Sequence, residues 1–223
     1  MKKEDFLKKI NEAAKKVERT DKSKIHLSVS KGNAKLHDLQ SVSFPAIITC
    51  ANCPCQDKCY ACKGNFTRYS VQFAYAKNLW LYKNNEEQYW REFKAMVFMN
   101  RFIRINVSGD IPDLNYLFHL VDVAKENSHC EILCFTKKYR MINLYLEKYK
   151  LPKNLHILFS IWRDYECDNP YKLPEAHVIY EDGFTTASPK AKECMGNCQQ
   201  CAATPGAGCF TLKKGEQVVF NEH

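Results

Sequence analysis

Residues 102–113 read Phe-Ile-Arg-Ile-Asn-Val-Ser-Gly-Asp-Ile-Pro-Asp, and the fold can be deduced outward from them. The first six, Phe102 to Val107, form an apolar run that predicts a strand. The Ser-Gly-Asp-Ile-Pro segment that follows is typical of a turn. Asp113 stands where a helix over residues 113–126 would need its N-cap. The stretch therefore predicts one strand, one turn and one helix in succession.

Similar strands and helices are predicted on both sides of this stretch. Short apolar runs predict further strands at residues 44–49, 130–135, 155–161 and 177–180. Apolar residues at helical spacing predict helices over residues 3–19, 67–83, 86–99 and 139–149. Cys130 and Cys134 share one face of a predicted strand, and we expect them in the core. The alternation predicts an α/β fold with a mainly parallel sheet, which is either open or part of a partial (β/α) barrel.

A dense group of cysteines follows the predicted strand at residues 44–49. Residues 50–64 read Cys-Ala-Asn-Cys-Pro-Cys-Gln-Asp-Lys-Cys-Tyr-Ala-Cys-Lys-Gly. A C-x3-C-x2-C triplet in this segment comprises Cys55, Cys59 and Cys62. Three thiolates can bind a four-iron, four-sulfur cluster and leave one iron open to a substrate or cofactor. Cys50 or Cys53 could instead supply a fourth ligand, or remain a spare thiol.

A second group of cysteines lies near the C-terminus. It consists of Cys194, Cys198, Cys201 and Cys209. The first three repeat the triplet spacing, and the fourth completes a closed site, which is typical of structural or electron-relay centres. His223 is a further possible ligand. Zinc sites of four cysteines prefer two C-x2-C pairs, such as Cys59 with Cys62 in the first group and Cys198 with Cys201 in the second. A zinc site that joins the two groups is therefore the alternative to iron–sulfur.

The composition favours metal binding over disulfides. The chain has 223 residues, 12 of them cysteine, and hydrophobic residues make up 45%. A chain of this length buries a core without disulfides. The first residues lead into no apolar run, and no stretch is apolar enough to cross a bilayer, so we expect no signal peptide and no membrane span. These features predict a cytoplasmic protein, and clustered cysteines in that reducing compartment favour metal binding.

Three segments are expected along the chain. Residues 1–40 form a basic helix and connector, residues 41–185 the α/β core with the first cysteine group, and residues 186–223 a cysteine-rich, metal-binding C-terminal extension. The net charge is +8, and the first segment holds 11 Lys or Arg residues against 6 Asp or Glu. This excess predicts either a solvated helix face or a contact with nucleic acid or another anionic partner.

Polar residues after the predicted strands are further candidates for ligand binding. Loops at the carboxyl ends of parallel strands gather ligands, so we expect the first cysteine group and Ser108-Gly109-Asp110 on one rim of the sheet. Asp110 either binds a cofactor amine or hydroxyl or belongs to an ordinary turn. Lys137 and Lys138 either meet an anionic substrate or begin a helix in solvent.

Several short motifs resemble the phage gene-product-88-like family of small cysteine-rich proteins. They occur in the family's order over about residues 40–223 and comprise Phe44-Pro45, Thr49-Cys50, Cys59-Tyr60-Ala61 with Lys63-Gly64, Ser108-Gly109-Asp110, Thr136-Lys137 with Tyr139, Leu151-Pro152 with Asn154, Cys198 with Cys201, and Val219-Phe220 with His223. The resemblance implies no particular activity. In this family a basic residue tends to follow Tyr-Ala, where this chain has Cys62. Cys50 is therefore an alternative third ligand of the first group.

The layout also resembles, more distantly, a reduced radical S-adenosylmethionine enzyme. Members of that superfamily carry a C-x3-C-x2-C loop after the first strand of a partial barrel and a Gly-Gly-Glu-type motif after the next strand. The matching residues are Cys55, Cys59 and Cys62, then Ser108, Gly109 and Asp110. The resemblance implies a [4Fe-4S] cluster on the cysteines and S-adenosylmethionine with its amine oriented by Asp110. The chain departs from the pattern at Tyr60, one position early for the usual aromatic residue, and at Ser-Gly-Asp.

Two functions follow as expectations. The first is an iron–sulfur protein with one or two [4Fe-4S] clusters, which receives electrons from a donor and acts on an unidentified substrate by radical chemistry. The second is a non-enzymatic module, stapled by zinc or a closed cluster, whose basic N-terminal region binds nucleic acid or a partner protein. Both hypotheses place the metal on the two cysteine groups.

Overall fold

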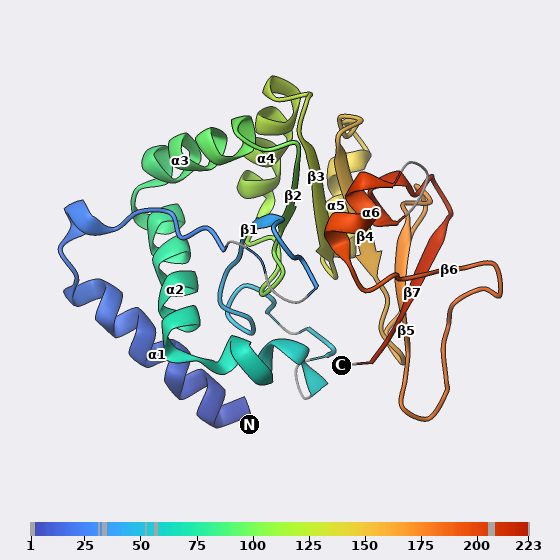
Figure 1. Cartoon of the computed structure of the whole chain (residues 1–223), viewed down its shortest axis with the longest axis horizontal. Helices are drawn as coiled ribbons and strands as arrows, with labels where there is room; N and C mark the ends of the chain where they lie inside the picture. Colours follow the sequence, from blue (N-terminus) through green and yellow to red (C-terminus); the bar gives the residue numbers. More distant parts are fainter. Residues whose placement is uncertain are drawn as a thin grey trace.

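The computed structural model describes residues 3–30, 32, 35–51, 53–55, 58–204 and 208–222. Within these residues the strands form one open, seven-stranded sheet of order β1-β2-β3-β4-β5-β7-β6, and all neighbours are parallel (Figure 1). The strands are β1 (Gln40–Val42), β2 (Phe102–Ile105), β3 (Glu131–Thr136), β4 (Leu155–Ser160), β5 (Glu175–Ile179), β6 (Lys192–Glu193) and β7 (Gln217–Asn221). The predicted α/β class with parallel strands is confirmed. The sheet does not close into a barrel, and β1 and β6 form its edges.

Consecutive strands from β1 to β5 are neighbours, so each connection steps in the same direction across the sheet. Right-handed crossovers of this kind bring their helices to one face, here called the helix face. The helices are α1 (Lys3–Arg19), α2 (Tyr69–Asn84), α3 (Glu86–Phe98), α4 (Leu114–Glu126), α5 (Tyr139–Leu146) and α6 (Cys198–Ala203). Helices α2 to α5 pack against strand residues such as Ile103, Ile132 and Ile157, and α1 packs against α2 (Figure 1).

The helices predicted from periodicity are confirmed to within a few residues. Asp113 is the N-cap of α4, and its carboxylate accepts a hydrogen bond from the backbone N–H of Tyr116 at 2.9 Å. The strand predicted at residues 44–49 is wrong, because β1 lies earlier and these residues form turns. Pro45 has no N–H to donate, and Ile47 has a φ of 70°, so neither suits a β-ladder.

The C-terminal segment belongs to the same sheet. β7 pairs with β5 on one side and with β6 on the other. Sequence reasoning did not predict β6, β7 or α6; β6 has only two residues and α6 only six. The last part of the chain covers the face of the sheet opposite to the helices, here called the cavity face, where Phe210 and Leu212 pack with Leu133 and Leu158. The division into three segments remains a prediction.

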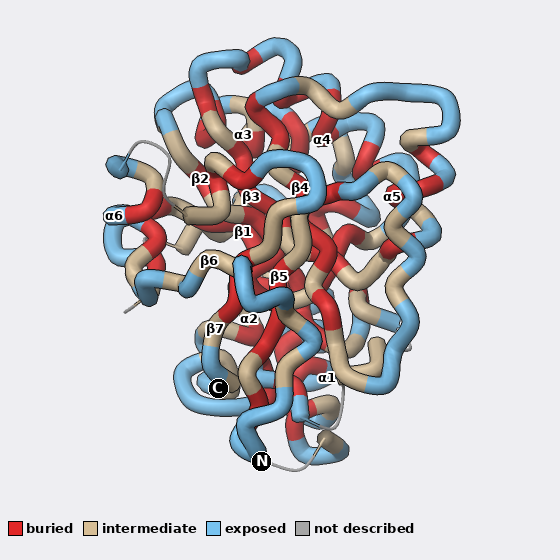
Figure 2. Tube along the Cα trace, turned by 90° about the vertical axis from the view of Figure 1, so that its right-hand side faces the viewer, coloured by how far each residue is buried: buried red, intermediate tan, exposed pale blue. Residues whose placement is uncertain are grey.

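Buried residues lie along the strands and on the sides of the helices that face them (Figure 2). Alternation along β2 puts Ile103 and Ile105 on the helix face and Arg104 on the cavity face. Cys130 and Cys134 are fully buried in the core of the helix face, as predicted. Within the ranges given above, no helix combines the length and the apolar composition needed to cross a membrane.

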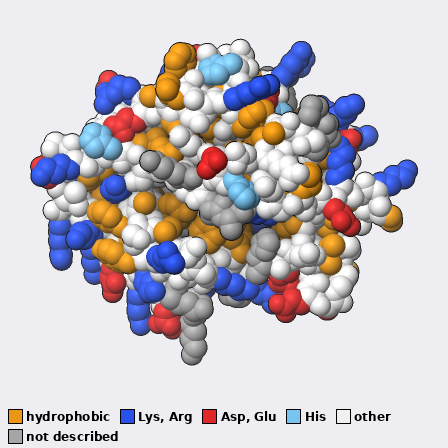
Figure 3. Space-filling model, in the orientation of Figure 1, with side chains coloured by type: hydrophobic (Ala, Val, Ile, Leu, Met, Phe, Trp, Pro, Cys, Tyr) orange, Lys and Arg blue, Asp and Glu red, His pale blue; other side chains and the backbone are white. Residues whose placement is uncertain are grey.

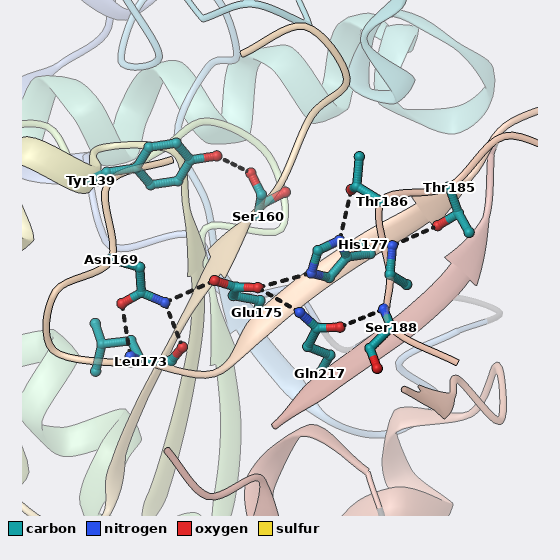
Figure 4. A network of polar contacts seen from close by, with 11 residues as sticks. Tyr139, Ser160, Asn169, Leu173, Glu175, His177, Thr185, Thr186, Ser188 and Gln217 are labelled. Atoms are coloured by element: carbon teal, nitrogen blue, oxygen red, sulfur yellow. Dashed lines mark hydrogen bonds and ion pairs between the residues drawn. The ribbon is translucent and has the colours of Figure 1, made fainter. Parts of the chain in front are cut away.

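A network of polar side chains joins β5 to β7 and to the loops around them (Figure 4). The Glu175 carboxylate accepts hydrogen bonds from Asn169 Nδ2 at 2.9 Å, His177 Nε2 at 3.0 Å and Gln217 Nε2 at 2.8 Å. His177 Nδ1 in turn lies 2.8 Å from Thr186 Oγ1. The connection from β4 to β5 contains no helix, so these hydrogen bonds, rather than helix packing, fix this part of the sheet.

Candidate functional site

The first cysteine group lies in the loop between β1 and α2. Hydrogen bonds join its sulfurs in sequence, from Cys53 to Cys55 at 3.0 Å, then to Cys59 and on to Cys62. The bond with Cys55 lowers the pKa of Cys59, whereas the bond with Cys62 and burial raise it, to a final value of about 11. Burial raises the pKa of Cys50 further. Thiols with raised pKa values keep their protons at neutral pH, so a metal that binds them must displace those protons.

Contacts to the turn after β2 hold this loop in place. The Tyr60 hydroxyl donates a hydrogen bond to the carbonyl of Val107. The backbone N–H of Asp110 donates one to Thr49 Oγ1 at 3.0 Å. The apolar side of α1 packs below the loop. The first cysteine group and the 108–110 turn therefore meet at the carboxyl ends of β1 and β2, as predicted.

The second cysteine group is fastened to two distant parts of the chain. The backbone N–H of Cys194 donates to the carbonyl of Val219 in β7 at 2.8 Å. The backbone N–H of Cys198 donates to the carbonyl of Lys35, also at 2.8 Å. Asn197 caps α6 through its side chain. These bonds bring the C-terminal cysteines to the cavity face, next to the segment that precedes β1.

Gly208 lets the chain pass closely over Cys201. Its φ of 69° favours glycine, and an added Cβ would lie 2.7 Å from the Cys201 sulfur. Burial raises the pKa of the neighbouring Cys209 to about 12; Arg104 opposes this shift, and the other sulfurs of the group add to it. All four sulfurs of the group are therefore near enough to influence one another. All twelve cysteines of the chain lie within the described residues and are free.

A cavity of about 690 Å³ lies between the two groups, on the cavity face. This volume is in the range of small-molecule sites. Its lining includes Cys55 and Cys59 of the first group, and Cys194, Cys198, Cys201 and Cys209 of the second. Its floor is apolar and includes Leu133 of β3 and Val178 of β5. Thiols from distant parts of the sequence thus border one space.

Arg104 lies between the groups, and sequence reasoning did not single it out. Its Nη1 is 3.6 Å from the Cys198 sulfur, and its guanidinium stacks 4.5 Å from the ring centre of Phe135. Burial alone would lower the pKa of Arg104, but Cys198, Tyr60 and Cys209 outweigh burial and raise it. The available signal was one arginine within the apolar run Phe-Ile-Arg-Ile, where a charge needs a buried partner.

Thiol sulfur is a suitable ligand for a soft metal, although the sulfurs of the two groups do not converge on one position. In the part of the chain that the structure describes, no three His, Cys, Asp or Glu side chains are arranged to hold a metal ion. The sulfurs of Cys53 and Cys55 are 3.0 Å apart. Two thiolates around one tetrahedral zinc ion keep about 3.8 Å. Metal binding would therefore require the Cys55 sulfur to move away from that of Cys53 and the ligand sulfurs of each group to gather around the metal.

The turn formed by Ser108, Gly109 and Asp110 lies outside the lining of the cavity. The Asp110 carboxylate accepts hydrogen bonds from Thr136 Oγ1 at 2.6 Å and from the backbone N–H groups of Ile111 at 2.7 Å and Lys137 at 2.9 Å. A Cβ at Gly109 would collide with the side-chain oxygen of Thr49 at 2.5 Å. Asp110 thus joins the loops after β2 and β3. Its role toward a cofactor amine remains a prediction and would require these partners to be exchanged.

The remaining candidate residues differ in whether they line the cavity. Lys137 lines the cavity, whereas Lys138 is the N-cap residue of α5 and lies outside the lining. Cys167 is half-buried in the loop before β5. His223 lies outside the described residues. Of the two lysines weighed from sequence, only Lys137 is therefore placed to meet a ligand in the cavity.

Comparison of the sequence with known proteins assigns the chain to a family. The family model described as Gene product 88 matches residues 6–195. Neither the curated proteins nor the solved structures gave a match. The matched region takes in most of α1, the first cysteine group, the 108–110 turn and the strands from β1 to β6, and it ends before α6. It covers far more than half of the chain, so the protein belongs to the Gene product 88 family, the phage family that its sequence motifs resemble.

Proposed function

We propose that this protein is an iron–sulfur protein whose two cysteine groups hold clusters on either side of the cavity. The ligands of the first cluster are Cys55, Cys59 and Cys62, with Cys50 as substitute or fourth ligand. The ligands of the second are Cys194, Cys198, Cys201 and Cys209. We further propose that the cavity is the reaction space of a reduced radical S-adenosylmethionine enzyme.

The observation that carries the proposal is the shared cavity. Thiols from the loop after β1 and from the C-terminal segment line the same space. The core on the helix face already stabilises the sheet, so these cysteines are not needed as staples for an otherwise small core. Clustered thiols in a protein of this size are best explained by a soft metal.

The two groups are suited to different roles. Three ligands in the first group would leave one iron open, and such a cluster can supply the electron for reductive cleavage of S-adenosylmethionine and hence for hydrogen abstraction from a substrate. Four ligands in the second group would close that cluster and suit it to relay electrons. The chain itself supplies an apolar floor at Leu133 and Val178, against which the apolar part of a substrate would pack.

Metal and sulfide analysis of anoxically purified protein tests the cluster proposal. We expect brown protein with absorbance near 400 nm and about four irons and four sulfides for each cluster. Colourless protein that contains zinc would overturn it in favour of the non-enzymatic module. Protein with neither metal, when reconstituted with iron and sulfide under anoxic conditions, must bind both, or the proposal fails.

The radical reaction has its own test. Dithionite-reduced protein with a full complement of iron should cleave S-adenosylmethionine to methionine and 5′-deoxyadenosine. The electron paramagnetic resonance signal of the reduced protein should also change when S-adenosylmethionine is added. Full iron content with neither response would leave an iron–sulfur protein and remove the radical enzyme.

A further inference from the structure

The cavity between the cysteine groups is rich in positive charge. The basic residues in its lining are Lys35, Lys58, Lys63, Arg68, Arg104 and Lys137. Among the described residues Glu222 is the one carboxylate in the lining, and its Oε2 accepts a hydrogen bond from the backbone N–H of Glu181 at 3.2 Å. On the face in Figure 3, hydrophobic side chains gather toward the middle and Lys and Arg side chains lie mainly around the outline.

Three of the cations are held over aromatic rings that also line the cavity. Arg104 lies 4.5 Å from the ring centre of Phe135 and Lys137 5.8 Å from that of Trp162. Lys35 lies 4.9 Å from the ring centre of Phe220. Cation–π contacts of this length hold a charged group in place without neutralising it. The cations are therefore positioned, and a negative charge in the cavity would be attracted to them.

Arg104 and Lys137 have donors that the described protein groups do not pair. The Nε of Arg104 is buried and has no hydrogen-bond partner within the described residues. Leaving such a donor unpaired costs about 1–3 kcal/mol. The ammonium of Lys137 donates to Ser160 Oγ at 2.8 Å, and two of its three hydrogens remain for other acceptors. An anion in the cavity would accept hydrogen bonds from Lys137 and pair electrostatically with the Arg104 guanidinium, whereas a neutral molecule would leave both charges without an anionic ligand.

We propose that the cavity binds an organic anion: a small molecule with a carboxylate or phosphate group held by Arg104 and Lys137, and with an apolar or aromatic body against Leu133, Val178 and Phe220. Both anionic groups accept bidentate hydrogen bonds from arginine. The apolar floor provides the body's contact area. Anion binding needs no metal. That this anion is the substrate of the enzyme rests on the proposed function.

Calorimetric titration of anoxically purified, full-length protein tests the proposal with a matched set of probes. The probes are 2-naphthoate, 2-naphthyl phosphate and the neutral 2-naphthamide. At least one anion should bind about tenfold or more tightly than the amide, because a charge-assisted hydrogen bond contributes about one decade in affinity or more. The stronger of the two anions identifies the acidic group. Equal affinity for anions and amide, or no binding of either anion at millimolar concentration, would overturn the proposal.

Two pairs of variants locate the binding site. Arg104→Gln should weaken the preferred anion about tenfold and leave the amide unchanged, whereas Arg101→Gln, an exposed arginine just before β2, should change neither. Lys137→Gln should behave like Arg104→Gln, with Lys138→Gln as its control. An anion that binds equally well to both cavity variants would refute the assignment. The second pair keeps the test open if the Arg104 variant does not fold.

Iron analysis of the same samples separates this proposal from the function proposed above. Protein without iron that still binds the anion through Arg104 and Lys137 would support the anion-binding site and refute the cluster proposal. Protein with full iron and no preference for anions would support the clusters and refute the anion-binding site.

Discussion

The Nη1 atom of Arg104 lies 3.6 Å from the sulfur of Cys198, although 94 residues separate them in sequence. Arg104 points from β2 into the cavity face, and Cys198 begins α6. The contact holds the C-terminal cysteines over the same strands whose carboxyl ends carry the first cysteine loop. A charged group on the cavity face thus links the two cysteine groups.

Individual cysteine substitutions should separate ligands from bystanders. Cys59→Ala and Cys201→Ala should each remove about half of the bound iron, because each is proposed to disrupt one of two clusters. Cys167→Ala should keep the wild-type iron content, since this thiol lies in the loop before β5, outside the cavity lining. Iron and sulfide assays after anoxic purification measure the result. Equal losses in all three variants would indicate a general folding defect.

The pair Cys50 and Cys62 tests which residue completes the first site. If Cys62 is the third ligand, Cys62→Ala should lose the iron of that group and Cys50→Ala should keep it. If the two thiols can replace each other, only the double variant should lose the iron. Loss in Cys50→Ala alone would make Cys50 the ligand. The same iron assay distinguishes the three outcomes.

Gly208→Ala should disturb the second cysteine group. Alanine is strained at the φ of 69°, and its Cβ would meet the Cys201 sulfur at 2.7 Å. We expect a loss of about 2–4 kcal/mol in the free energy of unfolding, from strain and collision together. Gly183→Ala is the matched control, because Gly183 has a φ of 78° and open space around its Cβ. Its expected loss is about 1 kcal/mol. Urea titration compares them, and equal losses would exclude the collision.

Asp110→Ala should destabilise the rim of the sheet. The substitution leaves the Thr136 hydroxyl and the backbone N–H groups of Ile111 and Lys137 without their acceptor. Each buried donor without a partner costs about 1–3 kcal/mol, so we expect a loss of about 2–4 kcal/mol after partial rearrangement. Asp122→Ala, at an exposed site of α4, should stay within about 0.5 kcal/mol of wild type. Chemical denaturation of both variants measures the difference.

Glu175 should make stability depend on acid pH. The hydrogen bond from His177 lowers its pKa most; burial opposes this, and Asn169 and Gln217 add to the lowering, so the pKa falls from 4.5 to about 2. A lowered carboxyl pKa means that the folded state prefers the carboxylate. The resulting stabilisation is full above pH about 4.5 and is lost as the pH falls toward about 2.

Glu175→Gln should therefore reduce the free energy of unfolding by about 1–3 kcal/mol at neutral pH. The dependence of that free energy on pH between about 4.5 and 2 should also become shallower. Glu166→Gln, at an exposed position, serves as the control. Unfolding measured across the acid range gives both quantities. An unchanged slope in the Glu175 variant would show that the network of Figure 4 does not stabilise the carboxylate.

Local sequence patterns identified most of the core elements. Helical spacing and an N-cap at Asp113 predicted α4, and apolar runs predicted β2, β3 and β4, because these signals depend on residues that are neighbours in sequence. The edge strand β1 was misplaced, since Phe44-Pro45 reads as an apolar run although proline cannot pair there. β6, with two residues, and α6, with six, are too short to give a periodic signal of their own, and β7 was not predicted either.

The sequence by itself determined the α/β class, the core positions of Cys130 and Cys134 and the two groups of clustered thiols. It could not determine that these groups border one cavity, because that depends on β7 entering the sheet beside β5 and carrying the C-terminal segment back over the cavity face. Nor could it assign Arg104 to that cavity. Alternation along β2 predicts that Arg104 faces away from Ile103 and Ile105, but only the tertiary structure shows which segments cover that face of the sheet. Long-range pairing, which no local pattern encodes, decided where the chemistry of this chain comes together.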